Sequence, residues 1–265
     1  MEYLNLGCGE IYHEDWINID YTSNSQSVLE YDLTKGIPKG DQTVDVVYHS
    51  HILEHFTKQQ AVEFLRECYR VLKPNGSIRI VVPDLQYSVK EYELAYNELK
   101  LEKNSFNQNR YDWSVIELVD QLTRTYSGGE VMRFLKQPVI HIEKELERRV
   151  GKGCLNYRDH LLNSENEEKT YSFKEKVKLY IFKLLGYSEF DYNYLNFHKI
   201  GELHKWMYDD ISTTNLLQDT GFSNVEIISN PKESRISNWE KYSFLDSENN
   251  LLRKPDSLIV EASKI

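Results

Sequence analysis

Short apolar runs alternate with polar connecting segments through the first part of the chain. Several of these runs are apolar at every position, which is typical of strands covered on both faces in a parallel sheet. The pattern predicts five strands in this region, at residues 3–6, 16–19, 27–31, 44–48 and 78–82.

A helix is predicted between the last two of these strands. Thr57 is expected to cap it, and Gln60, three residues on, completes a capping box. Residues 73–76, Lys-Pro-Asn-Gly, are expected to stop the helix and turn the chain into the next strand. The apolar face of the helix is formed by Ala61, Leu65, Cys68, Tyr69 and Leu72. The order strand, helix, strand predicts a right-handed crossover and a layered α/β fold.

The pattern becomes helical after the fifth strand. Helices are predicted at residues 84–103, 112–126, 130–150 with a break before Pro138, and 173–185. We therefore expect a helical insertion at residues 102–200.

Strand-like alternation returns near Gly201. Ser212 is expected to cap a helix that ends at Gly221, and strands are predicted at residues 224–228 and 257–262. We therefore expect residues 1–101 and 201–265 to form one sheet domain.

The composition is that of a globular protein with an acidic surface. Of the 265 residues, 40% are hydrophobic and 28% are charged, and the formal net charge is −10. Because an acidic surface repels phosphate backbones, we do not expect a nucleic-acid partner. The three cysteines are odd in number and widely spaced, so neither a disulfide framework nor a metal site is expected. No apolar run approaches the roughly 20 residues of a membrane span and no signal peptide is expected, so we place the protein in the cytoplasm.

Candidate binding residues follow the predicted strands. Gly7 and Gly9 come directly after the first strand, where glycine lets the backbone turn sharply and approach a ligand. Asp20 ends the second strand, where a carboxylate can accept both hydroxyls of a ribose, and Asp32 ends the third, where it could accept a bond from an adenine amino group. Ligands of open α/β sheets bind at these carboxyl ends, so the residues are expected to share one site.

The ordered motifs resemble a known family. GCG, WINID, YDLTKGIP, DVVYHSHILEHF and YRVLKPNGSIRIVVPD look like the successive motifs of class I S-adenosylmethionine-dependent methyltransferases, above all small bacterial ones that read LGCG and then W-x-N-x-D. The resemblance covers roughly residues 3–84 and resumes at 204–209 and 216–225. It implies a Rossmann-like sheet of about seven strands, mostly parallel with the last antiparallel, and S-adenosyl-L-methionine as the cofactor.

The resemblance also assigns roles to individual positions. It implies that the glycine loop borders the methionine part, that Asp20 binds the ribose, and that Asp32 with Leu33 reads the adenine. His49, Ser50 and His51 would line the floor near the sulfonium. The full set of implied cofactor-binding residues is Leu6, Gly7, Cys8, Gly9, Asp20, Asp32, Leu33, His49 and Ser50.

The sequence departs from the family pattern near the first strand. Asn5 stands where the family often has an acidic residue, and the third glycine of the usual loop is missing. Only residues 10–16 separate the loop from the second strand, so the usual first helix must be very short or replaced by a loop. The missing glycine also weakens a nicotinamide-binding interpretation, which requires GxGxxG.

Three residues are candidates for acid–base chemistry. Methyl transfer is an in-line displacement, and a hydroxyl acceptor needs a base, for which histidine suits near neutral pH. His51 and His204 are the first candidates, and Asp84 is well placed after the fifth strand. Each has a structural alternative, because His51 could fix its loop, His204 could belong to a packed lid, and Asp84 could cap a helix.

The sequence therefore predicts a methyltransferase that acts on oxygen or nitrogen of a small molecule or sugar unit. The insertion is expected to cover the cleft and form most of the acceptor site, and no motif calls for a metal. Two alternatives stay open: a non-catalytic or regulatory protein that binds the same cofactor, and a dinucleotide-dependent oxidoreductase. The acceptor, the methylated atom and the oligomeric state are not determined by the sequence.

Overall fold

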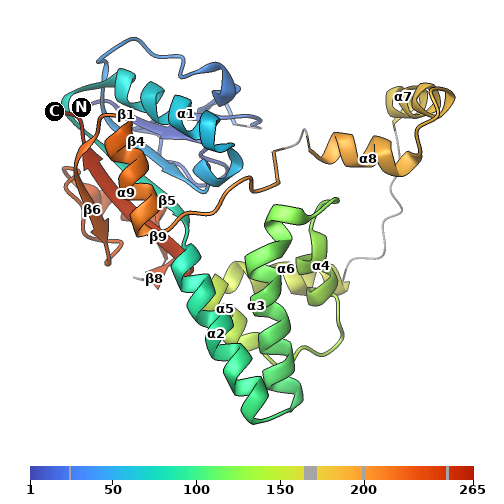
Figure 1. Ribbon diagram of the computed structural model, residues 1–265. Coiled ribbons are helices and arrows are strands. Elements are labelled where there is room, and N and C mark those ends of the chain that lie inside the picture. Colours follow the sequence, from blue (N-terminus) through green and yellow to red (C-terminus); the bar gives the residue numbers. More distant parts are fainter. Residues whose placement is uncertain (24, 164–171, 199–200, 249–250) are drawn as a thin grey trace. The chain divides into compact units, whose positions relative to one another are not determined.

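A computed structural model describes residues 1–23, 25–163, 172–198, 201–248 and 251–265 (Figure 1). The chain forms two compact units. The first, which we call the sheet unit, comprises Met1–Tyr87, Arg149–Gly151 and Lys205–Ile265, and the second, the helical unit, comprises Ser88–Arg148 and Lys152–His204. The division expected from the sequence, residues 1–101 with 201–265 against 102–200, stays a prediction.

The sheet unit is built on seven strands in the order β3-β2-β1-β4-β5-β9-β6 (Figure 1). The pairs β3–β2, β2–β1, β1–β4 and β4–β5 are parallel, whereas β9 runs antiparallel to both β5 and β6. This arrangement confirms the predicted fold class, including the antiparallel last strand. The strands are β1 (Tyr3–Leu6), β2 (Ile17–Asp20), β3 (Val28–Glu30), β4 (Val44–Ser50), β5 (Leu72–Pro83), β6 (Ser223–Ile228) and β9 (Ser257–Ser263).

The strand order reverses at β1. The chain moves from β1 outward to β2 and β3, then returns to place β4 on the other side of β1. In open α/β sheets, ligands bind at such a switch point, beyond the carboxyl ends of the strands. The topology therefore predicts a binding site at the carboxyl ends of β1 and β4.

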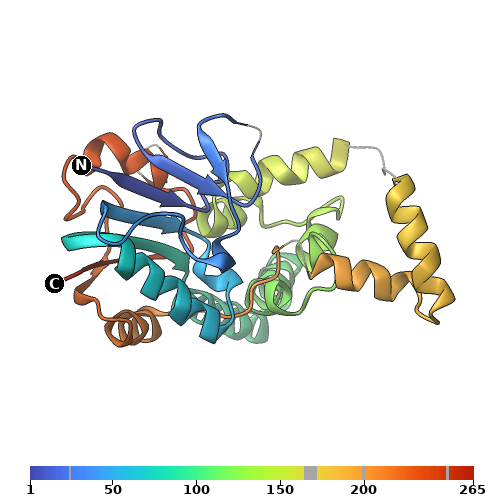
Figure 2. The ribbon, with the colours of Figure 1, turned by 90° about the horizontal axis from the view of Figure 1, so that it is seen from above.

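Apolar cores cover both faces of the sheet. On one face, α1 (Lys58–Val71) and α9 (Asp210–Asp219) pack against strand residues such as Leu6 and Val47. On the other face, Tyr48 joins an aromatic cluster with residues of α10 (Trp239–Tyr242). Figure 2 shows these two layers on opposite sides of the sheet. The remaining short elements are η1 (Leu33–Lys35), η2 (Leu53–His55), η3 (Ser243–Leu245), β7 (Ser247–Glu248) and β8 (Leu251–Leu252).

The predicted capping box of α1 is confirmed. The Thr57 side chain accepts a bond from the backbone N–H of Gln60, and the Gln60 side chain accepts one from the backbone N–H of Thr57. The predicted stop is also confirmed, since α1 ends at Val71. Residues 73–76 do not form a separate turn, however, because they already belong to β5, where Asn75 donates its N–H to the carbonyl of Lys264 at 2.8 Å.

Within the residues that the structure describes, the helical unit contains seven helices, of which α2 begins and α5 ends in the sheet unit. Expected helices appear as α2, α4, α5 and α7, and the expected break before Pro138 separates α4 from α5. The helices are α2 (Leu85–Leu101), α3 (Ser105–Thr123), α4 (Gly129–Leu135), α5 (Glu143–Val150), α6 (Lys152–Asn163), α7 (Phe173–Leu184) and α8 (Glu189–Phe197). Within the described ranges, none of these helices combines the length and apolar character needed to cross a membrane.

Two sequence-based predictions of helix starts were wrong. The helix expected from residue 112 begins at Ser105, because the side chain of Asn104 caps it by accepting a bond from the N–H of Asn107. The cap of α9 is Asp209, and Ser212 is the third helical residue of the resulting capping box. Ser212 therefore completes the cap of α9 instead of providing it.

Candidate functional site

A cavity of about 360 Å³ lies in the sheet unit at the carboxyl ends of β1 and β4. Its volume falls within the range of small-molecule sites. Five of the sequence-predicted residues line it: Gly7, Cys8, Gly9, Ser50 and His51. The lining also includes residues that the sequence did not single out, among them Tyr48, Asp246 and Ser257. The cavity thus combines the glycine loop, the end of β4 and the segment that leads into β9.

The glycine loop requires its glycines for two different reasons. Gly7 has φ = +64°, and a Cβ atom there would lie 1.9 Å from Cδ1 of Ile52, so any other residue would strain the backbone and displace the Ile52 side chain. Gly9 has φ = +53°, but a Cβ there would meet nothing within 4 Å. The backbone at Gly9 is therefore open to a ligand. No helix lies between this loop and β2, which confirms that a loop replaces the usual first helix.

The two predicted adenosine-binding carboxylates lie outside the cavity. Asp20 ends β2, where its carboxylate accepts the N–H of Gly9 at 2.7 Å. Asp32 caps η1 by accepting the N–H and the hydroxyl of Thr34 at 3.0 and 2.6 Å, and these bonds hold the pKa of its carboxyl below the usual value. Leu33 begins η1 and packs against the main core. Asp20 is thus bonded to the loop that lines the cavity, whereas Asp32 is engaged in its own turn.

The side chains at the end of β4 point to opposite faces of the sheet. Tyr48 and Ser50 line the cavity, as alternation along a strand requires. His49 is fully buried on the other face, with its ring 5.2 Å from that of Phe64 on α1. Burial lowers the pKa of His49 from 6.5 to about 4, so its imidazole is neutral at physiological pH. His49 does not line the cavity, and Leu6, fully buried in the core, does not line it either.

His51 stands at the point where β4 leaves the sheet. Its backbone has φ = +55°, a left-handed conformation that is costly for a residue with a side chain, and its N–H donates to the carbonyl of Val81 at 2.8 Å. Its Nε2 lies 3.0 Å from the hydroxyl oxygen of Ser257, and its Nδ1 lies 3.2 Å from a carboxylate oxygen of Glu54. The backbone strain thus places the ring between a hydroxyl and a carboxylate.

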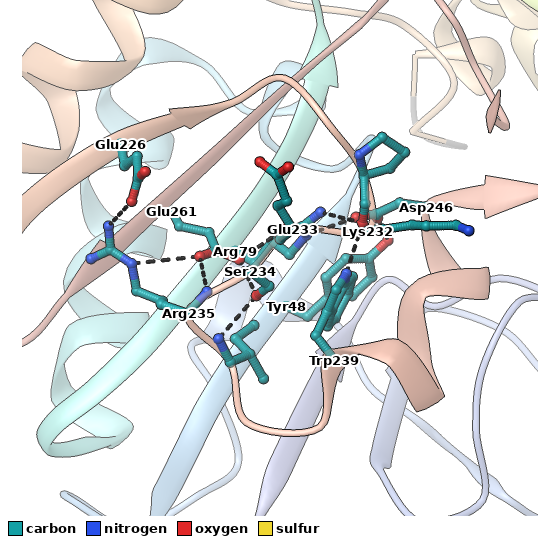
Figure 3. Close-up of polar contacts among 12 residues, drawn as sticks. Tyr48, Arg79, Glu226, Lys232, Glu233, Ser234, Arg235, Trp239, Asp246 and Glu261 are labelled. Atoms are coloured by element: carbon teal, nitrogen blue, oxygen red, sulfur yellow. Dashed lines mark hydrogen bonds and ion pairs between the residues drawn. The ribbon is translucent and has the colours of Figure 1, made fainter. Parts of the chain in front are cut away.

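A buried ionic network supports the wall of the cavity (Figure 3). The hydroxyl of Tyr48 donates to Asp246 at 2.6 Å, and Nε of Arg79 donates to the same carboxylate at 2.7 Å. Arg79 also donates to Glu261 at 2.6 Å and lies over the ring of Trp239 at 4.3 Å. Burial raises the pKa of Asp246 above its usual value, which the guanidinium of Arg79 opposes. The network holds Tyr48 and Asp246 in fixed positions at the cavity.

The other two candidate acid–base residues, Asp84 and His204, have contacts of their own. The Asp84 carboxylate accepts the N–H of Gln86 at 2.9 Å at the start of α2, and Asp84 does not line the cavity. His204 belongs to the helical unit, where it is buried and donates its backbone N–H to the carbonyl of Gln121 at 2.9 Å. Their catalytic roles stay predictions.

Sequence reasoning missed four residues at this site. Glu54 lies in the quoted motif DVVYHSHILEHF, three residues after His51, so its spacing offered a signal. Tyr48 is the last residue of the predicted fourth strand, and Ser257 is the first residue of the predicted final strand. Asp246 lies in a segment with no such signal, since its contacts with Arg79 and Tyr48 are long-range.

Comparisons with known proteins extend these observations. Residues 4–80 match a family model described as a methyltransferase domain. A probable S-adenosylmethionine-dependent methyltransferase of Mycolicibacterium smegmatis is 30% identical over 100 residues, which cover 31% of this chain and 38% of that protein. The match therefore spans less than half of the relative's length.

Two solved structures align with the full length of this chain. A SAM-dependent methyltransferase from Archaeoglobus fulgidus is 14% identical, with a TM-score of 0.41 over 100% of this chain and 86% of that chain. A possible histamine N-methyltransferase from Thermotoga maritima is 10% identical, with a TM-score of 0.41 over 100% of this chain and 82% of that chain.

Proposed function

Since the domain that includes residues 4–80 belongs to the class I S-adenosylmethionine-dependent methyltransferase superfamily, we propose that the chain transfers a methyl group from S-adenosyl-L-methionine. The acceptor is a small molecule or a sugar unit, methylated on oxygen or nitrogen. The observation that carries this proposal is the cavity at the switch point, where an open glycine backbone and a histidine face the same space.

The residues at this switch point fit the proposed cofactor. The open space at Gly9 gives a ligand access to the backbone, and Asp20 is held beside it by the 2.7 Å bond from the Gly9 N–H. Asp20 would bind the ribose hydroxyls, and Asp32 with Leu33 would contact the adenine. The glycine loop would border the methionine part, and Ser50 would line the floor near the sulfonium. When bound, the cofactor supplies an electrophilic methyl group on a sulfonium.

The cavity itself would receive the acceptor next to the methyl group. Ser50, Tyr48 and Asp246 offer hydroxyl and carboxylate groups that suit the hydroxyls of a small polar acceptor. His51 would accept the proton that a hydroxyl acceptor must lose. Held between Ser257 and Glu54, its ring needs no reorientation for this task.

Ligand-induced stabilisation tests the cofactor. We expect adenosylmethionine and adenosylhomocysteine to raise the melting temperature, with a stabilisation of about 2.7 kcal/mol at a ligand concentration of a hundred times Kd. NAD serves as the comparison ligand. If NAD stabilises the chain and neither sulfur compound does, the oxidoreductase alternative replaces this proposal.

Labelled methyl transfer then tests the activity. An acceptor panel of alcohols, sugars and amines is incubated with the chain and a methyl-labelled donor, and product formation is measured. Cofactor binding without transfer to any member of the panel would instead favour the regulatory alternative.

A matched pair of variants tests the ribose-binding role. Asp20→Asn is expected to weaken adenosylhomocysteine binding at least tenfold, because bonds to a charged acceptor contribute about 1.5–3 kcal/mol. Asp219→Asn, an exposed change at the end of α9, is expected to leave Kd unchanged. Calorimetric titration measures both, and equal affinities would exclude Asp20 from the site.

A further inference from the structure

Two side chains from separate segments meet at the imidazole ring of His51. His51 follows β4, Glu54 lies in η2, and Ser257 is the first residue of β9. Glu54 Oε1 lies 3.2 Å from Nδ1 of His51, and the Ser257 hydroxyl lies 3.0 Å from Nε2. A carboxylate oxygen thus lies near one ring nitrogen, and a hydroxyl lies near the other.

The buried carboxylate of Glu54 determines which nitrogen of the His51 ring carries the proton. Its side chain is 1% exposed, against 13% for that of His51, so the carboxylate acts on the ring with little screening by water. A carboxylate beside Nδ1 favours a proton on that nitrogen, which leaves the lone pair on Nε2. The Ser257 hydroxyl then donates to Nε2, because in this tautomer only an acceptor is present there.

A second carboxylate acts on the same ring. Asp256, whose Oδ1 atom is buried, interacts electrostatically with His51, and burial raises the pKa of Asp256 while His51 opposes the rise. Lys254 and Arg149 are the cationic groups that act on Asp256. Both acidic groups favour an imidazolium once His51 takes up a proton.

We propose that Glu54, His51 and Ser257 form a proton relay that makes this site specific for hydroxyl acceptors. The inference rests on the proposed function and narrows the proposed reaction to O-methylation. A neutral amine attacks with its own lone pair, whereas a hydroxyl is a weak nucleophile that needs a base during the transfer. A histidine beside a buried carboxylate supplies the base that a hydroxyl acceptor needs.

The relay conserves atoms and charge. The acceptor oxygen forms a bond to the methyl carbon while the carbon–sulfur bond breaks, and the sulfur keeps that electron pair and becomes a neutral thioether. The proton of the acceptor hydroxyl passes to Nε2 of His51, and Glu54 stabilises the imidazolium. During the reaction, the acceptor hydroxyl replaces the Ser257 hydroxyl beside Nε2 of His51. Glu54 and Ser257 are positioning residues, and His51 is the catalytic residue.

Nuclear magnetic resonance of the full chain with ¹⁵N-labelled histidine tests the relay without any acceptor. The His51 signals are identified by their loss in His51→Asn. We expect the Nδ1–H tautomer in the unchanged chain, and we expect Glu54→Gln to increase the population of the Nε2–H tautomer. Glu54→Asp should restore part of the Nδ1–H population. The control Glu63→Gln, on the exposed side of α1, should leave the His51 tautomer unchanged.

Two outcomes of this experiment would overturn the relay. One is an Nε2–H tautomer for His51 in the unchanged chain, which also decides the matter if Glu54→Gln does not fold. The other is a His51 tautomer population that Glu54→Gln leaves unchanged. Because neither measurement requires methyl transfer, a failure here is distinguishable from failure of the proposed function, which the adenosylhomocysteine stabilisation reports.

A paired acceptor assay tests the specificity. Matched alcohols and amines are compared, and Glu54→Gln is expected to reduce kcat for alcohols about a hundredfold or more, with KM and adenosylhomocysteine affinity retained. Transfer to amines alone, or an alcohol kcat that Glu54→Gln does not alter, would contradict the proposal.

Discussion

Gly7 and Gly9 both have positive φ, but their surroundings differ. An alanine at Gly7 adds a clash with Ile52 to the backbone strain, whereas an alanine at Gly9 adds strain alone. We expect Gly7→Ala to lower the free energy of unfolding by more than about 2 kcal/mol and Gly9→Ala by about 1 kcal/mol. Urea unfolding of both variants measures the difference. Equal losses would show that the Ile52 side chain moves away without cost.

His49 makes stability depend on pH. Its pKa in the folded chain, about 4, lies below the ordinary value of 6.5, so the unfolded chain takes up the proton first as the pH falls. The contribution of neutral His49 to the free energy of unfolding is complete above about pH 6.5, and it is lost as the pH falls toward 4. Between pH 7.5 and 5, we expect the free energy of unfolding to fall by about 2 kcal/mol less in His49→Leu than in the unchanged chain.

Urea unfolding at several pH values measures this loss. The control is His198→Gln, a change at an exposed histidine, which should keep the pH dependence of the unchanged chain. A His49→Leu variant with the original slope would show that other groups cause it.

Single residues of the site differed in how far the sequence revealed them. Gly7, Gly9 and His51 were predicted because each directly follows a strand, and strand ends can be located from apolar patterning. The contact of His51 with Ser257 joins residues 206 positions apart, and no local pattern encodes such a pairing. His49 was expected near the ligand, yet alternation along β4 turns its side chain into the core.

At the scale of elements, Arg79 joins β5 to β9 and to the segment that contains Asp246. Replacing it by methionine leaves two buried carboxylates, those of Asp246 and Glu261, without the guanidinium. We expect Arg79→Met to lower the free energy of unfolding by about 3–5 kcal/mol, because a buried charge that loses its partner is strongly destabilising.

The matched control removes a cation from an exposed pair. Lys183 lies 3.0 Å from Glu189 with both side chains about half exposed, and Lys183→Met should change stability by less than about 0.5 kcal/mol. Urea unfolding, monitored by tryptophan fluorescence, compares the Arg79→Met and Lys183→Met variants. A loss under about 1 kcal/mol for Arg79→Met would mean that the carboxylates bind protons or reach water instead.

The sequence predicted the strands better than the helices. Strands β1 to β5 were each located within a few residues except for the early start of β5, because their apolar runs are bounded by polar turns. Helix α6 was missed, since Arg158 is its only buried residue and no apolar stripe marks it. Helix α8 was also missed, although its capping box of Ser188 and Asp191 was a readable signal.

At the scale of the whole molecule, the net charge of −10 sets which large partners are repelled. We expect no saturable binding of a labelled DNA duplex or of transfer RNA below about 100 µM protein at physiological salt, where nucleic-acid-binding proteins have dissociation constants of about 1–100 µM without sequence specificity. Fluorescence anisotropy measures this. Tight binding that weakens steeply with salt would reveal a local basic surface.

The position of β9 has a consequence for synthesis of the chain on the ribosome. This strand, at residues 257–263, inserts between β5 and β6, so both neighbours present bare edges until it emerges. A nascent chain therefore carries an incomplete sheet through most of translation. During that time it is a natural client for chaperones that shield unpaired strand edges.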